Sequence, residues 1–190
     1  MRLVVTEFLS LDGVAESPQW TFPYWSDDTA AFKGEETARS SALLLGRKTY
    51  EEFAAAWPQR GDAEGGSFFN PVKKYVVTST RTKDIWQNAS FLRADRKAVE
   101  DLKSKPGGDL TVHGSLSLAR WLVNEGLVDE LRLLVYPVVV GKGKRLFDDG
   151  VAPAKLRLAK AQALDKGVVA LVYEPAKGQG GEATVNQKVK

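Results

Sequence analysis

The sequence has no cysteine and a single histidine, His113, among its 190 residues. Without cysteine the chain cannot contain disulfides, thiol nucleophiles or cysteine-ligated zinc and iron–sulfur centres. One imidazole also excludes every site that needs two or more histidines. The composition does not exclude a carboxylate-bound Mg²⁺, but no aspartate-rich ligand loop occurs in the chain. We therefore expect a protein without a metal centre.

Long apolar runs and long runs of one charge are also missing. No apolar segment approaches the roughly 20 residues that span a bilayer, and Glu7 interrupts the N-terminal apolar stretch where a signal peptide would continue. Lysine and arginine number 27 against 24 acidic residues, a formal net charge of +3. This mixture indicates a solvated surface rather than a nucleic-acid interface, and a preference for small anionic ligands fits it equally well. We expect a soluble, cytoplasmic protein with no nucleic-acid or membrane partner.

What the sequence does contain is ordinary globular composition, with 43% hydrophobic and 27% charged residues. Its length is enough for one domain with a substantial core. From residue 175 onward the chain is rich in glycine, lysine, glutamine and glutamate and has little to bury. We therefore expect a single domain over residues 1–174 and a disordered polar tail over residues 175–190.

Hydrophobic patterning separates strands from helices along this domain. Apolar and β-branched runs predict strands over residues 3–9, 42–45, 73–78, 110–112, 129–140 (one strand, or two broken at Pro137), 156–164 and 168–173. Capping signals and helical periodicity predict helices over residues 26–39, 50–56, 95–103 and 116–124. Along the chain, the predicted strands and helices alternate until residue 129, and this alternation indicates an α/β fold with a mainly parallel sheet and right-handed crossovers. The turn at residues 165–167 adds antiparallel strands at one edge.

Two predicted strands each run into a helix through a glycine and a hydroxyl residue, at residues 46–49 and 114–117. A helix N-terminus offers unpaired N–H groups and the positive end of a dipole, and Arg47 and Lys48 add full charges at the first corner. Either corner alone is equally well read as a simple turn. Because both lie at the carboxyl ends of strands, together they indicate a ligand with more than one phosphate.

A third polar segment, residues 78–81, follows the strand that ends near Val77. Its three hydroxyls and one guanidinium suit a terminal phosphate monoester, although a polar turn explains them as well. The first strand lacks the Gly-x-Gly-x-x-Gly that marks the common dinucleotide-binding fold. Residues 141–144 are not a phosphate-binding P-loop either, because Arg145 stands where a hydroxyl would bind Mg²⁺.

These motifs resemble the dihydrofolate reductase-like superfamily in their order, over residues 10–13, 45–51, 76–79 and 112–115. Residues 126–131, with Pro137, 141–143 and 146–147, are similar to the reductase domain at the C-terminus of bifunctional riboflavin-biosynthesis enzymes. The resemblance implies a three-layer α/β/α domain with antiparallel C-terminal edge strands. It also implies NADPH bound at the carboxyl ends of the strands.

The same resemblance assigns cofactor contacts to particular positions of this sequence. Those that match the corner at the cofactor phosphates are Gly46, Arg47, Lys48 and Thr49. Those that match the region of the adenosine ribose and its 2′-phosphate are Thr78, Ser79 and Arg81. Those that match the glycine corner under the pyrophosphate are Gly114, Ser115 and Leu116, and those near the nicotinamide are Val14 and Ala15.

On the substrate side, Asp28 matches the substrate-binding acid of dihydrofolate reductases and is the catalytic candidate. Burial beside the aromatic residues would raise the pKa of its carboxyl and suit it to supply or relay a proton. Its place in the first turn of a helix explains an acid equally well. Trp20, Phe22 and Trp25 either stack on a flat heterocycle or pack as core under a long loop.

The function expected from these residues is an NADPH-dependent reductase that transfers hydride to a pteridine- or aminopyrimidine-type heterocycle. Its reaction would be like that of dihydrofolate reductase or of 5-amino-6-(5-phosphoribosylamino)uracil reductase. The alternative is a protein that binds NADPH or a nucleotide without turnover. A homodimer is a further expectation, if the apolar residues 131–140 form an edge surface; the same pattern fits an internal strand.

Overall fold

The computed structural model describes residues 1–62, 65–80, 84–148 and 151–176. These residues form one eight-stranded sheet in the order β4-β3-β2-β5-β1-β6-β8-β7. The strands are β1 Leu3–Ser10, β2 Ser40–Gly46, β3 Lys73–Val77, β4 Ala89–Leu92, β5 Asp109–His113, β6 Glu130–Tyr136, β7 Leu156–Ala163 and β8 Val169–Pro175. Strands β1 to β6 pair in parallel, whereas β8 pairs antiparallel with both β6 and β7. The predicted fold class is confirmed.

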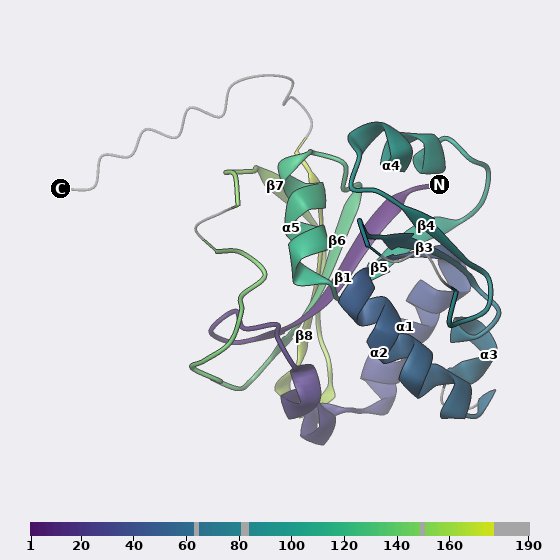
Figure 1. Ribbon diagram of the computed structural model, residues 1–190. Helices are drawn as coiled ribbons and strands as arrows, with labels where there is room; N and C mark the ends of the chain where they lie inside the picture. The colour runs from purple at the N-terminus through teal and green to yellow at the C-terminus, as the bar shows by residue number, and fades with distance from the viewer. Residues whose placement is uncertain (63–64, 81–83, 149–150, 177–190) are drawn as a thin grey trace.

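Helices cover both faces of this sheet, so the domain has three layers (Figure 1). The helices are α1 Asp27–Arg39, α2 Arg47–Ala56, α3 Gly66–Phe69, α4 Arg96–Lys103 and α5 Leu116–Asn124, and the 3₁₀ turns are η1 Pro18–Tyr24, η2 Trp57–Gln59 and η4 Asp165–Gly167. On β2, Leu43 and Leu45 pack with Tyr50 of α2, whereas Leu44 joins the core cluster that contains Leu122 of α5. Alternate side chains of one strand therefore fill two separate cores.

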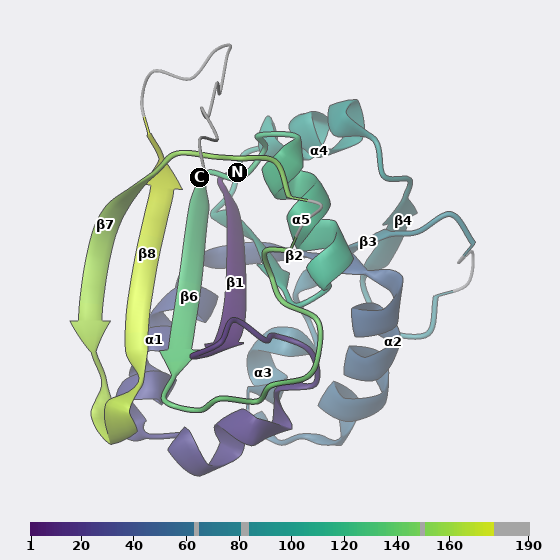
Figure 2. The same ribbon diagram turned by 90° about the vertical axis from the view of Figure 1, so that its left-hand side faces the viewer.

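Strand β6 lies inside the sheet, between β1 and β8. Its side chains are buried on both faces, which is why its sequence is apolar except for Glu130 and Arg132, both of which are buried and form ion pairs. The prediction that residues 131–140 form an edge surface for a second subunit is therefore wrong, and the internal-strand alternative holds. The edge on this side is β7, all eight residues of which are exposed, and Figure 2 shows that no helix lies in front of β7 and β8.

Some element boundaries differ from the sequence-based expectation. The predicted strand over 129–140 ends at Tyr136, and the residues after Pro137 form a connection. Strand β4 and helix α3 were not predicted, because each has only four residues and no clear periodicity. Strand β8 includes Pro175, so the domain extends past the expected boundary at 174; residues 177–190 of the expected tail lie outside the described residues. In the described part of the chain, no helix combines the length and apolar character needed to cross a membrane.

Strand β1 continues for four residues beyond its pairing with β5, and the end of this pairing places the candidate site. Strand β1 pairs with β5 only from Leu3 to Thr6, although on its other side it pairs with β6 as far as Ser10. The chain leaves β1 through α1 on one face and leaves β5 through α5 on the opposite face. Adjacent strands with connections to opposite faces form a crevice where open α/β sheets bind ligands. We call this the β1–β5 crevice.

Candidate functional site

Beside this crevice, the two glycine corners predicted from the sequence contact each other. The backbone N–H of Gly46 donates to Ser115 Oγ at 2.8 Å, and Ser115 Oγ donates to Thr49 Oγ1 at 2.6 Å. A Cβ at position 46 would lie 2.8 Å from Ser115 Oγ, so a side chain there would displace the Ser115 hydroxyl. Gly114 and Ser115 both have positive φ, 62° and 67°, which turns the chain sharply from β5 into α5.

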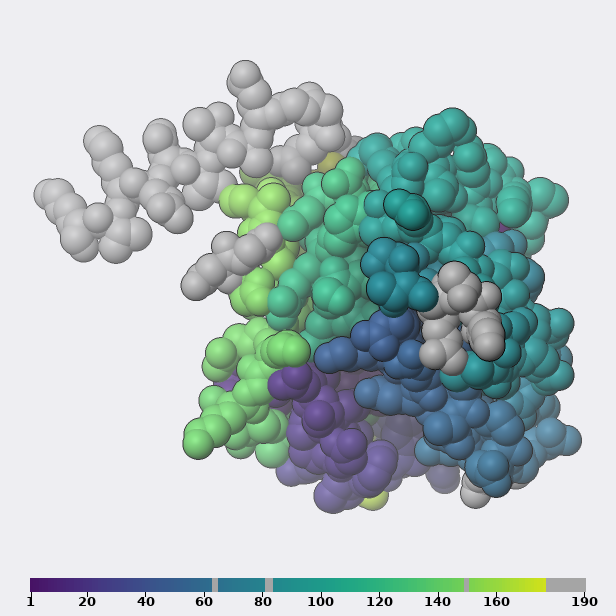
Figure 3. All heavy atoms as spheres, viewed as in Figure 1, coloured from purple at the N-terminus to yellow at the C-terminus, as the bar shows by residue number. Residues whose placement is uncertain are grey.

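This contact brings the N-termini of α2 and α5 together. Neither helix has a side-chain hydrogen bond to its first-turn N–H groups at the N-cap, in the chain as described. Their unpaired donors and the positive ends of two dipoles therefore face the same region. Figure 3 shows the start of α2, the N-terminal loop and α5 meeting on one face of the molecule. Two converging helix N-termini can bind a diphosphate without any metal.

Cations lie at the rim of this region. Arg47 begins α2 and forms an ion pair with Glu51 at 2.9 Å, while Lys48 is exposed. Across the crevice, hydrogen bonds from Lys144 lower the pKa of Glu16, with a weaker contribution from Lys48. The charge of Lys48 therefore acts on the loop that follows β1, which lies on the other side of the crevice.

The third predicted segment begins beside the first corner. Val77 is the register partner of Gly46, so Thr78 and Ser79 continue β3 next to the start of α2. The N–H of Thr80 donates to Thr78 Oγ1 at 3.2 Å and closes a tight turn, in which Ser79 is exposed. Arg81, predicted to meet the 2′-phosphate, lies outside the described residues.

The loop after β1 is held in place by Asp12. Its carboxylate accepts hydrogen bonds from Ser10 Oγ at 2.7 Å and from the N–H groups of Val140 and Gly141 at 3.0 and 2.9 Å. These bonds lower the pKa of Asp12 to about 2. Val14 and Ala15, predicted to lie near the nicotinamide, are buried in this loop. The sequence indicated only a turn at residues 10–13, because the two backbone partners of Asp12, Val140 and Gly141, are more than 120 residues away.

Of the two environments considered for Asp28, the structure has the exposed first turn of a helix and not burial beside the aromatic residues. The residue is exposed in the first turn of α1, where the helix dipole alone favours an acid.

The aromatic residues divide between the two alternatives, stacking on a ligand and packing under the loop. Trp20 packs against Tyr136 with ring centroids 5.7 Å apart, whereas Phe22 is 70% exposed and Trp25 43% exposed. Trp20 is therefore partly buried against the core, whereas Phe22 and Trp25 are more exposed and can contact a ligand.

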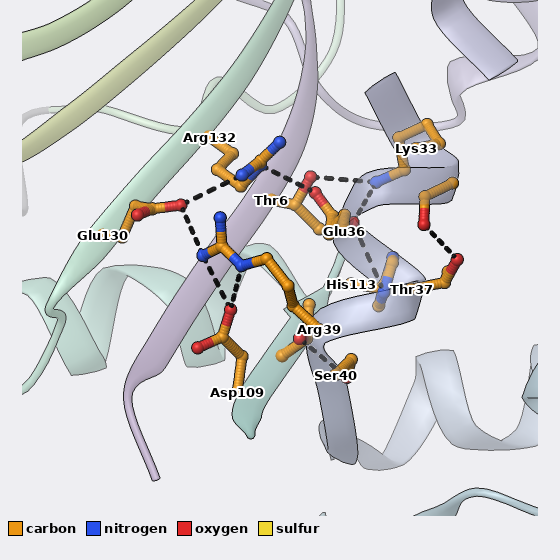
Figure 4. A network of polar contacts seen from close by, with 12 residues as sticks. Thr6, Lys33, Glu36, Thr37, Arg39, Ser40, Asp109, His113, Glu130 and Arg132 are labelled. Atoms are coloured by element: carbon orange, nitrogen blue, oxygen red, sulfur yellow. Dashed lines mark hydrogen bonds and ion pairs between the residues drawn. The ribbon is translucent and has the colours of Figure 1, made fainter. Parts of the chain in front are cut away.

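A buried polar network ties α1 to the sheet beneath it (Figure 4). Lys33 Nζ donates to Thr6 Oγ1 at 3.0 Å and to the carboxylate of Glu36. Burial opposes ionisation of Glu36, but Lys33, His113 and Arg132 together lower its pKa. Burial lowers the pKa of His113 to about 3, so the imidazole is neutral at pH 7. With His113 neutral and Glu36 ionised, the network orients α1 and places one cation, Lys33, near the β1–β5 crevice.

One residue of the site, Glu7, was treated in the sequence only as an interruption of an apolar run. It is 5% exposed in β1, and its Oε1 atom has no hydrogen-bond partner. Burial raises the pKa of its carboxyl to about 8, although Lys33 acts in the opposite direction. Perturbed carboxyls of this kind concentrate at functional sites. The only local signal was an acidic residue in an otherwise apolar strand.

The chain is similar to known proteins over most of its length. The family model described as the RibD C-terminal domain matches residues 2–170. The uncharacterized protein YyaP of Bacillus subtilis (strain 168) is 30% identical over 177 residues, which cover 90% of this chain and 94% of that protein.

Solved structures show the same fold. A provisionally assigned riboflavin biosynthesis protein from Shewanella sp. PV-4 has a TM-score of 0.69 at 17% identity, covering 93% of this chain and all of that one. Dihydrofolate reductase from Enterococcus faecalis, solved with NADP(H), has a TM-score of 0.65 at 15% identity, covering 92% of this chain and 96% of that one.

Proposed function

Because this chain belongs to the RibD C-terminal domain family, we propose that it is an NADPH-dependent reductase whose cofactor lies along the β1–β5 crevice. The observation that carries the proposal is the contact between Gly46, Ser115 and Thr49, which joins two helix N-termini at the carboxyl edge of the sheet. Their free N–H groups fit a pyrophosphate. The similar fold of a dihydrofolate reductase solved with NADP(H) supports the same choice of cofactor.

The other cofactor contacts follow from the positions of the three segments. Gly46, Arg47, Lys48, Thr49, Gly114, Ser115 and Leu116 are proposed to bind the phosphates. Thr78, Ser79 and Arg81 are proposed for the adenosine ribose and its 2′-phosphate, where the polar turn after β3 lies next to α2. Val14 and Ala15 are proposed for the nicotinamide.

The acceptor we propose is a pteridine- or aminopyrimidine-type heterocycle. Phe22 and Trp25 are exposed beside the start of α1 and are proposed to stack on it, with Asp28 orienting the water that supplies the proton. NADPH, when bound, supplies the hydride. The protein contributes mainly by aligning the two rings at close distance, without a flavin or a metal.

Cofactor binding is tested first by thermal denaturation. At a free NADPH concentration 100 times Kd, binding adds about 2.7 kcal/mol, which corresponds to a rise in Tm of roughly 5–11 °C for a domain of this size. NADH should give a smaller rise because it lacks the 2′-phosphate. No rise with millimolar NADPH would refute the proposal.

Turnover separates a reductase from a protein that only binds the cofactor. The decrease in absorbance at 340 nm is followed with dihydrofolate, folate, pterins and phosphoribosylaminopyrimidines as acceptors. Oxidation of NADPH with one of these supports the reductase. Tight NADPH binding together with no oxidation by any acceptor favours the alternative, a binding protein.

A further inference from the structure

Glu7 lies on the α5 side of the β1–β5 crevice. Its neighbour Thr6 points to the other face, because Thr6 Oγ1 accepts a hydrogen bond from Lys33 of α1. Side chains alternate along a strand, so Glu7 shares its face with Val5 and Leu9, which belong to the core cluster under α5. Ala15, from the loop after β1, belongs to the same cluster.

Glu7 is also the first residue of β1 beyond its pairing with β5. The last register pair is Thr6 with His113, so the next residue along β5 is Gly114, which has no side chain. On the other side of β1, the register partner of Glu7 is Leu133. Glu7 therefore lies just past the end of the β1–β5 pairing, between the glycine of one proposed cofactor corner and an apolar residue.

The charged groups around Glu7 do not neutralise it. From α1, Lys33 is the cation that acts on its ionisation, but Lys33 donates its hydrogen bonds to Thr6 and Glu36. From β5, His113 is neutral at pH 7. From α5, Arg120 pairs with Asp148 at 2.6 Å and donates to the carbonyl of Leu146. A buried carboxyl with an unpartnered oxygen and no direct ion pair is costly unless a ligand completes its hydrogen bonds.

We propose that the Glu7 carboxyl group binds the primary carboxamide of the nicotinamide ring. In its protonated form the carboxyl has one O–H donor and one carbonyl acceptor, and a carboxamide has the complementary pair. An ionised carboxylate would offer only acceptors and would repel the amide oxygen. The inference rests on the proposed function, because it takes NADPH as the ligand of the crevice. It adds a side-chain contact to the nicotinamide, the part of the cofactor that donates the hydride.

The test compares Glu7→Gln with Glu7→Leu by titrating NADPH fluorescence at pH 7 and at pH 9.5. Glutamine keeps a donor and an acceptor, so E7Q should bind NADPH within about threefold of the wild type. Leucine keeps the volume but has neither, so E7L should bind about tenfold or more weakly, the loss expected for two hydrogen bonds. Glu174→Gln, which removes a carboxylate paired with Arg157 at the sheet edge, is the matched control and should bind as the wild type does.

The pH dependence adds a measurement that a purely structural role would not affect. With a pKa of about 8 for Glu7, Kd of the wild type should rise about 30-fold from pH 7 to pH 9.5, because only the protonated form binds well. E7Q should show no such rise. The 3-acetylpyridine analogue of NADP⁺ lacks the amide donor; it should bind the wild type more weakly than NADP⁺ does, but should bind E7L with the same affinity as NADP⁺.

The outcomes separate this inference from the proposed function. If the wild type does not bind NADPH at all, the proposed function fails. If the wild type binds NADPH while E7L and E7Q bind it equally well with flat pH profiles, the carboxamide contact is refuted and the proposed function stands. Thermal denaturation confirms that each variant is folded, and if E7L does not fold, the pH profiles of the wild type and E7Q still decide the matter.

Discussion

Ser115→Ala tests whether the two glycine corners, at residues 46–49 and 114–117, hold each other in place. The substitution removes Ser115 Oγ, which accepts a hydrogen bond from the Gly46 N–H at 2.8 Å and donates one to Thr49 Oγ1 at 2.6 Å. A partly buried N–H without a partner costs about 1–3 kcal/mol, and the lost hydroxyl bond adds about 1 kcal/mol. We expect the free energy of unfolding to fall by about 2–4 kcal/mol, and Tm by roughly 4–16 °C.

Two further variants make this measurement specific. Ser117→Ala changes an exposed serine in the first turn of the same helix and should leave the urea midpoint unchanged. Ser115→Gly also loses both hydrogen bonds, but it relieves the left-handed conformation at φ 67°, so it should be about 1 kcal/mol more stable than Ser115→Ala. Equal urea midpoints for S115A and S117A would show that the contact between the corners contributes nothing.

The remaining predictions concern three acidic residues. The pKa of Glu7 is raised from 4.5 to about 8, so between these pH values the folded state holds a proton that the unfolded state has lost. The free energy of unfolding should therefore fall as pH rises from 5 to 8. Urea unfolding of E7Q should show a flatter dependence on pH. Asp12→Ala should expose residues 137–146 to limited proteolysis, read by mass spectrometry, because two backbone donors lose their acceptor; a cleavage pattern like that of the wild type would contradict this. Asp28→Asn should leave the NADPH Kd unchanged and lower kcat at least tenfold, and an unchanged kcat would remove Asp28 from the mechanism.

The two glycine corners, at residues 46–49 and 114–117, could be predicted because their signals are local. A buried strand, a glycine and a helix start within ten residues define each corner, and parallel strands place both at the same edge of the sheet. The sequence also indicated the antiparallel end of the sheet from the turn at residues 165–167. It could not show that Gly46 and Ser115 touch, because 69 residues separate them.

Asp28 and Glu7 show the limit of this reasoning most clearly. Both are single acids whose chemistry depends on burial, and burial depends on what other segments place above them. The sequence alone determined the α/β class, the order of the strands and helices apart from β4 and α3, and the three segments that end at one edge. Only the tertiary structure decided which acid is shielded from water: Asp28 lies exposed on a helix start, while α5 and the loop after β1 enclose the face on which Glu7 lies. The reason is physical, since secondary structure follows from neighbours in the chain, whereas desolvation follows from neighbours in space.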